Sequence, residues 1–348
     1  IYAFRMREIK IISLYIIFLL LVPAGLKAQD FQFTQFYAAP LNLSPAFAGA
    51  MEVTRVGINY RKQWPGLGYD FNAYGLYFDT YIDETNVGFG FSASQFSESL
   101  LNIQSTDFAG YISYKLTLNN QSFLRFGGQL GLVNRSLTLQ EMVFGDQIDL
   151  LNRTVNPASM DLLPGEDSKW YPDIAFGALL QAQDFWFGVS SSHLSRPNIG
   201  FLEDGIGNNL PIKWGAHGGY VKNLDRRLFK TGEMRKVFSV SFNYKRQGTF
   251  QQIEVIPQIQ VENFIGGLGF RNITRFNELP DQNSVNAVLG FSLLNGITMA
   301  YSYDYMLNKF SNPAHVSHEV SIYFTDLLKK KFMQTILPCP PSNAEWRY

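Results

Sequence analysis

The chain has 348 residues with 29 basic and 29 acidic side chains, so its formal net charge is zero. Only 17% of the residues are charged, whereas Phe, Tyr and Gly number 30, 18 and 29. This balance excludes a nucleic-acid-binding surface, which needs clustered Lys and Arg, because the densest basic stretch, residues 226–236, is interrupted by Glu233 and is typical of a solvated loop.

Residues 1–28 have the pattern of a secretory signal peptide. Arg7 and Lys10 precede a predominantly apolar run from Ile11 to Val22, and small residues lead to Ala28. The run is shorter than the roughly 20 apolar residues that a membrane-spanning helix needs. We therefore expect export and cleavage after about Ala28 rather than retention as an anchor.

From about residue 52 onward, apolar residues alternate with small or polar ones in segments of roughly ten, a period of two that predicts β-strands. In residues 86–94 and 297–305, for example, aromatic and aliphatic side chains share one face and Gly, Ser or Thr the other. A soluble core is not lined with Gly and Ser, whereas a membrane barrel turns its apolar face to lipid and its polar face inward. The pattern predicts an all-β fold, a transmembrane antiparallel β-barrel.

The segments of alternating residues number about fourteen. With both chain ends in the periplasm, alternate connections should be long outer loops and tight periplasmic turns; residues 223–235 and 245–249 depart from this rule, being too long and too short. The predicted strands cover residues 52–62, 70–80, 85–96, 103–118, 122–138, 172–181, 185–193, 211–222, 236–245, 250–260, 263–271, 284–293, 297–305 and 316–325.

Two segments flank the predicted barrel of residues 51–326. Residues 29–50 hold an aromatic run and two prolines, and they form either a periplasmic tail or a plug inside the barrel. Fourteen strands enclose more space than their own side chains fill, which favours the N-terminal plug. Residues 327–348, with three consecutive lysines and a proline-rich end, are predicted to be a short periplasmic C-terminal tail.

Candidate catalytic residues are few, and the chain has four histidines. His315 and His318 would point to opposite faces of a strand, so a metal site is disfavoured. His193 lies two residues from Ser195, but a hydroxyl is activated only beside an oriented base, and a polar rim is the favoured interpretation. His217 lies in a glycine-rich stretch and should face the lumen or a neighbouring backbone.

Inward carboxylates such as Asp304 and Glu319 could serve acid–base chemistry, but such groups more often pair with basic residues inside a barrel. Cys339, the single cysteine, gives no disulfide framework or thiolate metal cluster and is predicted to be an unpaired tail residue. We expect no catalytic residue, no cofactor and no metal.

Several stretches resemble the PorP/SprF outer-membrane proteins of the type IX secretion and gliding machinery of the Bacteroidetes. The most specific stretch has Tyr301, Tyr303 and Asp304 on one strand and a Ser-His-Glu sequence, residues 317–319, on the next. The chain departs from the family pattern at Ala300, where Gly is frequent, and at Phe47, where Tyr is common. The resemblance rests on residues 31–49, 59–64, 189–197, 211–220 and 297–324.

The resemblance implies a non-enzymatic outer-membrane barrel that supports secretion or surface attachment of cargo through protein–protein contacts. Its implied partners are other type IX components, cargo proteins and outer-membrane lipid. Two alternatives remain at this point: a porin-like or hydrophobe-conducting transport barrel, and a barrel hydrolase using His193 or His217 with a nearby serine.

Overall fold

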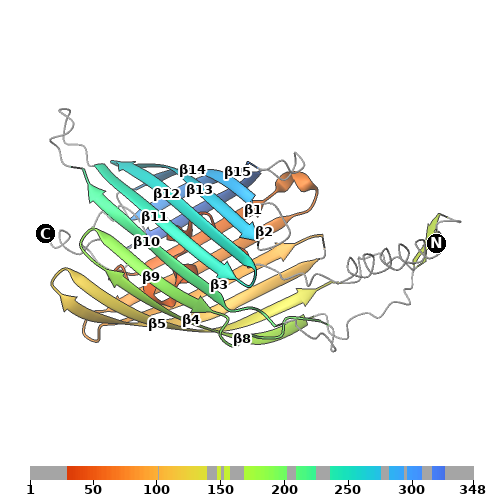
Figure 1. Ribbon diagram of the computed structural model, residues 1–348, viewed down its shortest axis with the longest axis horizontal. Coiled ribbons are helices and arrows are strands. Elements are labelled where there is room, and N and C mark those ends of the chain that lie inside the picture. The colour runs from red at the N-terminus through yellow and green to blue at the C-terminus, as the bar shows by residue number, and fades with distance from the viewer. Residues whose placement is uncertain are drawn as a thin grey trace, which may run out of the picture. The chain divides into compact units, whose positions relative to one another are not determined.

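The computed structural model describes residues 30–100, 102–138, 147–149, 153–156, 168–201, 209–224, 236–275, 282–293, 296–307 and 316–325. Within them, fourteen antiparallel strands form a closed barrel (Figure 1), which confirms the predicted fold class. The predicted signal peptide and C-terminal tail, with Cys339, lie outside the described residues, as does His315. In the part of the chain that is described, no helix is both long and apolar enough to cross a membrane.

The barrel strands follow one another around the ring in chain order, and a two-stranded hairpin that the alternation did not predict lies between β5 and β8. The barrel strands are β1 (Arg55–Gln63), β2 (Phe71–Ile82), β3 (Val87–Glu98), β4 (Ile103–Asn119), β5 (Ser122–Leu137), β8 (Ser168–Gln181), β9 (Phe185–Ser192), β10 (Lys213–Asn223), β11 (Lys236–Gln247), β12 (Phe250–Val261), β13 (Phe264–Arg275), β14 (Gln282–Ser292), β15 (Ile297–Met306) and β16 (Val316–Thr325), and the hairpin is β6 (Ile148–Asp149) with β7 (Thr154–Val155).

The first and last strands close the barrel. β1 pairs with β16 along its whole length, from Arg55 opposite Thr325 to Gln63 opposite Ser317. Closure satisfies the backbone of both strands, and a sheet in hydrocarbon has no other way to pair the N–H and C=O groups of its edges. The ladder therefore has no open edge.

The observed strands differ from the predicted ones mainly where cross-strand pairing extends them. β8 begins at Ser168 rather than residue 172 because residues 168–171 pair with the loop-side part of β5. β13 continues to Arg275 rather than residue 271 because it pairs with β12 up to Phe250. β1 begins at Arg55, three residues later than predicted, so residues 51–54 are not barrel strand.

The outer face of the barrel is apolar. Leu130, Leu268 and Leu289 expose 72%, 71% and 68% of their surface, although each lies inside a strand. Residues of the opposite parity on the same strands are turned inward, and several of them are buried, as with Val133 on β5 and Val288 on β14. This alternation of an apolar exterior with a polar or small interior is the arrangement of a barrel that faces lipid.

The two ends of the barrel differ in their connections. At one end, here called the turn end, β1 begins and β16 ends, and most connections are short, as at residues 83–86, 120–121 and 262–263. At the other, called the loop end, most connections are longer, as between β5 and β8. The two exceptions noted in the sequence persist, because β10 ends and β11 begins at the turn end with twelve residues between them in the sequence, and Gly248-Thr249 forms a tight turn at the loop end.

Residues 31–54, here called the inner segment, lie inside the barrel (red in Figure 1). They form three short helical turns, η1 (Phe36–Ala38), α2 (Pro40–Leu43) and η2 (Pro45–Phe47). Proline is the first residue of both α2 and η2, where its missing N–H costs no helical hydrogen bond. Ser44 starts η2 by accepting a hydrogen bond from the backbone N–H of Ala46.

The lipid-facing assignment of the outer surface gives a first prediction. Leu130 is at the middle of β5, so Leu130→Arg should lower the free energy of unfolding by about 2–4 kcal/mol, the cost of Arg at the bilayer midplane. The matched Leu118→Arg change, one residue from the end of β4, should cost only about 0–1 kcal/mol. Urea titrations of the protein in lipid vesicles measure both, and equal losses would contradict the assignment.

Candidate functional site

The inner segment fills the middle of the barrel with an apolar layer. Phe36, Leu41 and Phe47 belong to one buried cluster with wall residues from strands all around the ring. The wall residues of this cluster are Tyr77 on β2, Ala109 and Tyr111 on β4, Leu179 on β8, Trp186 on β9, Ile256 on β12, Val288 on β14 and Tyr323 on β16. Because the layer contacts opposite sides of the wall, it lies across the lumen rather than along one side.

A line of small residues on the inner wall contacts the inner segment. Gly88, Ser113, Gly127, Gly177 and Ser190, here called the small-residue row, are paired in turn across β3, β4, β5, β8 and β9. All of them face inward. A row that follows the hydrogen-bonding direction of the sheet in this way leaves a track without bulky side chains on the inner wall.

The backbone of the inner segment follows this row strand by strand. A Cβ added to Gly177 would lie 2.0 Å from Ser44 Oγ, one on Gly127 2.3 Å from the backbone N of Ala46, and one on Gly88 2.1 Å from Ala48 O. Real Cβ atoms do not approach this closely, so glycine is required by contact with the inner segment.

The two serines of the small-residue row satisfy backbone carbonyls of the inner segment. Ser190 Oγ donates to Leu43 O at 2.8 Å, and Ser113 Oγ donates to Ala48 O at 2.6 Å. A buried carbonyl without a partner would cost about 1–3 kcal/mol. The carbonyl groups at the C-terminal ends of α2 and η2 are therefore hydrogen-bonded to the barrel wall.

At the loop end, two carboxylates of the wall hold the start of the inner segment. Glu319 accepts hydrogen bonds from the backbone N–H groups of Thr34 and Gln35, at 2.6 and 2.9 Å. Asp304 accepts one from the Thr34 hydroxyl at 2.6 Å. Hydrogen bonds to ionised groups are the stronger kind, so this contact fixes the position of residues 34 and 35.

These carboxylates belong to a larger buried network, the loop-end ionic cluster of Arg61, Glu254, Arg271, Asp304 and Glu319. Arg61 contacts Asp304 at 2.8 Å and Glu319 at 3.3 Å, and Arg271 contacts Glu254 at 2.6 Å and Asp304 at 3.1 Å. Buried charges are tolerated only when they are paired and hydrogen-bonded. Asp304 and Glu319 thus pair with basic residues, as inward carboxylates of barrels more often do.

A second set of ion pairs holds the other end of the inner segment, near the turn end. Arg55 and Asp79 form a bidentate pair with both distances at 2.9 Å, and Asp79 also accepts the backbone N–H of Gly49 at 2.8 Å. Glu52 contacts Lys115 and lies 3.1 Å from Arg125. Both ends of the inner segment are thus joined to the wall by charged groups.

The histidines considered as candidates do not form a catalytic set in the described residues. His193 Nδ1 is 3.0 Å from Asp173, but Ser195 donates its hydroxyl to the Pro172 carbonyl at 2.8 Å. His318 contacts the Tyr301 hydroxyl at 2.7 Å on the outer face. No group of three or more His, Cys, Asp or Glu side chains able to hold a metal occurs among the residues that the structure covers.

His217 faces the lumen, as one of the two predicted possibilities had it. It is fully buried, and the centroid of its ring lies 5.3 Å from that of Phe47 of the inner segment and 5.9 Å from that of Trp186. Gly188 lies directly against it, since a Cβ there would be 2.3 Å from His217 Nε2. Its environment is therefore an aromatic packing site for the inner segment.

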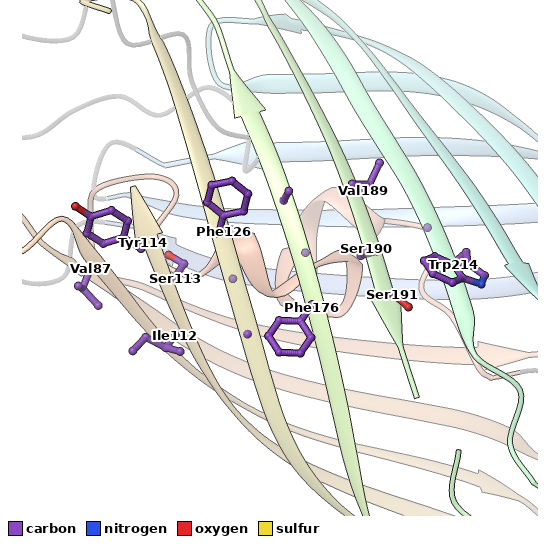
Figure 2. A pocket seen from close by; sticks show the side chains of 15 residues that line it. Val87, Ile112, Ser113, Tyr114, Phe126, Phe176, Val189, Ser190, Ser191 and Trp214 are labelled. Atoms are coloured by element: carbon purple, nitrogen blue, oxygen red, sulfur yellow. The ribbon is translucent and has the colours of Figure 1, made fainter. Parts of the chain in front are cut away.

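The outer wall has a shallow apolar depression behind the small-residue row (Figure 2). Its volume is about 900 Å³, and the exposed rings of Phe126, Phe176 and Trp214 project beside it. Two glycines in sequence, Gly127 and Gly128, place no side chain on either face of β5 here. The wall between lipid and the inner segment is consequently little more than backbone.

The two glycines of β5 give a matched pair of variants. Gly127→Ala should lower the free energy of unfolding by about 1–3 kcal/mol, because its Cβ would overlap the inner segment and overpacking costs this much. In Gly128→Ala the nearest atom is 3.6 Å away, so stability should stay the same or rise by about 0.4–1 kcal/mol through the less flexible unfolded chain. Urea titration of both variants in lipid vesicles measures the difference. Equal effects would contradict the close contact between the small-residue row and the inner segment.

Comparison with solved structures returns bacterial barrels at low identity. The chain is similar to Omp33 of Acinetobacter baumannii at 8% identity and a TM-score of 0.44, covering 80% of this chain and 99% of that one. It is similar to the CymD monoaromatic hydrocarbon channel at 12% identity and a TM-score of 0.46, covering 87% of this chain and 94% of that one. It is also similar to a Pseudomonas aeruginosa FadL homologue at 10% identity and a TM-score of 0.42, covering 80% of this chain and 93% of that one.

Among curated proteins, none matches the sequence. The family comparison is more informative, because a model described as "Type IX secretion system membrane protein PorP/SprF" matches residues 25–324. The matched range contains the inner segment and almost all of the barrel. The chain therefore belongs to the PorP/SprF family of type IX secretion system membrane proteins.

Proposed function

We propose that this outer-membrane barrel is a non-enzymatic component of type IX secretion and gliding that supports secretion or surface attachment of cargo through protein–protein contacts. The observation that carries the proposal is the lumen occupied by the inner segment. A barrel that conducted ions or polar solutes would need a continuous polar path. The apolar layer around Phe36, Leu41 and Phe47 crosses that path instead.

The mode of attachment supports a permanent filling of the lumen. Ion pairs and charge-assisted hydrogen bonds hold the inner segment at both ends, and the small-residue row fits its backbone closely in the middle. Hydrogen bonds to charged groups contribute about 1.5–3 kcal/mol each. Withdrawal of the segment would break those of Thr34, Gln35 and Gly49 together with the Glu52 ion pairs.

The polar groups of the described residues support a role without chemistry. The Ser195 hydroxyl is directed to the Pro172 carbonyl, and His217 is enclosed by aromatic rings. Neither arrangement gives an activated nucleophile, which requires a base in hydrogen-bond contact with it. We therefore assign the function to the surfaces of the barrel that contact other proteins.

The surfaces available differ between the ends of the barrel. Single-chain bacterial barrels place short turns in the periplasm and long loops outside, so we place the turn end in the periplasm. Export would depend on the signal peptide, cleaved after about Ala28. Periplasmic type IX components would meet the turns and the C-terminal tail, while cargo at the cell surface would meet the loops.

One experiment with two readouts separates the secretion role from a porin-like or hydrophobe-conducting barrel. Deleting the gene should reduce secreted or surface-attached type IX cargo, and wild-type protein should restore it. In planar bilayers, the wild-type protein should give no sustained conductance because the apolar layer blocks the lumen. Deleting residues 36–47 should produce stable conductance steps.

The controls keep both readouts interpretable. Heat-modifiable migration on gels reports whether the deletion variant still forms a barrel, and full-length Glu319→Gln, which weakens the loop-end contact, should give occasional openings if the deletion does not fold. Normal cargo in a strain without redundant paralogues, together with steady wild-type conductance, would reject the secretion role in favour of transport.

A further inference from the structure

The inner segment begins at the loop end of the barrel. The Phe31 ring stacks on Phe96 at 5.7 Å, and Phe96 is two residues from the loop end of β3. Gln32 contacts Gln252, the third residue of β12, and Lys245, two residues before the end of β11. Both of these wall residues flank the tight turn at Gly248-Thr249, which also lies at the loop end.

From there the inner segment runs the length of the lumen to the opposite end. Residues 34 and 35 meet the loop-end ionic cluster, the apolar layer follows, and Ala50 O accepts a hydrogen bond from Gln181, the last residue of β8 at the turn end. β1 then starts at Arg55 on the turn-end side. The order of these contacts along the chain matches their order along the barrel axis, from the loop end to the turn end.

We propose that the chain enters the lumen from the loop end, so that the amino-terminal end of the mature protein is displayed on the cell surface. The inference rests on contacts of residues 31–35 and on the turn end being periplasmic. The apolar layer of residues 36–50 separates Phe31 from the periplasmic mouth. Phe31 and Thr325, the last residue of β16, lie at opposite ends of the barrel.

This placement divides the partners by compartment. A periplasmic protein can bind the turns, but it cannot reach the chain at Phe31 to withdraw the inner segment. A partner outside the cell can reach the amino terminus beside the loops.

Cysteine labelling tests the placement in a Cys339→Ser background, which removes the one native thiol. Asp30→Cys reports the amino-terminal end, Asp70→Cys the loop end and Asn120→Cys the turn end; Asp70 and Asn120 are both exposed in connections between strands. A membrane-impermeant maleimide is applied to intact and to permeabilised cells. Asp30→Cys and Asp70→Cys should label equally under both conditions, and Asn120→Cys only after permeabilisation.

Each alternative outcome counts against the proposal. Labelling of Asp30→Cys only in permeabilised cells, or in neither condition, while Asp70→Cys labels in intact cells, would overturn the entry from the loop end. Labelling of Asn120→Cys but not Asp70→Cys in intact cells would overturn display at the cell surface. The labelling is independent of cargo, so it separates this inference from the secretion role.

Discussion

The closed hydrogen-bonded ring is the constraint on which the rest of the structure depends. In hydrocarbon each backbone N–H and C=O must find a partner, and closing β1 onto β16 provides it. A ring of fourteen strands encloses more space than inward side chains fill, and this chain fills the space with its own residues 31–54. The inner segment in turn requires glycine and serine in the small-residue row and paired charges at both ends.

The charged residues of the lumen follow from the same constraint. Each carboxylate of the loop-end ionic cluster contacts a guanidinium, and two of them also bind groups of the inner segment. Such networks contribute more to the choice of one arrangement than to net stability, since desolvation offsets much of the attraction. We interpret the cluster as the device that sets the register of residues 34 and 35 against the wall.

Much of the fold was predictable from the sequence because alternation is a local signal. β16 was predicted at its observed bounds, and β15 was predicted to within one residue at Met306. The inward position of Asp304 and Glu319 followed from the same parity. The extension of β8 to Ser168 was not predictable, because it depends on pairing with a strand more than thirty residues away.

The site was less predictable than the fold, for a physical reason. A glycine in a strand can mark a bulge, a bend or a close approach, and only the cross-strand register aligns Gly88, Gly127 and Gly177 under one segment. Arg61 and Arg271 have the parity of inward residues, a signal that could have identified them. Their joint contact with Asp304 still required the three-dimensional arrangement.

Hydrogen–deuterium exchange in lipid nanodiscs tests most directly whether the inner segment is a fixed part of the barrel. The backbone N–H groups of Thr34, Gln35 and Gly49 donate to buried carboxylates, so they should exchange as slowly as the amides of the barrel strands. Exchange of residues 34–50 at the rate of an unstructured peptide, with the strands still protected, would contradict the account.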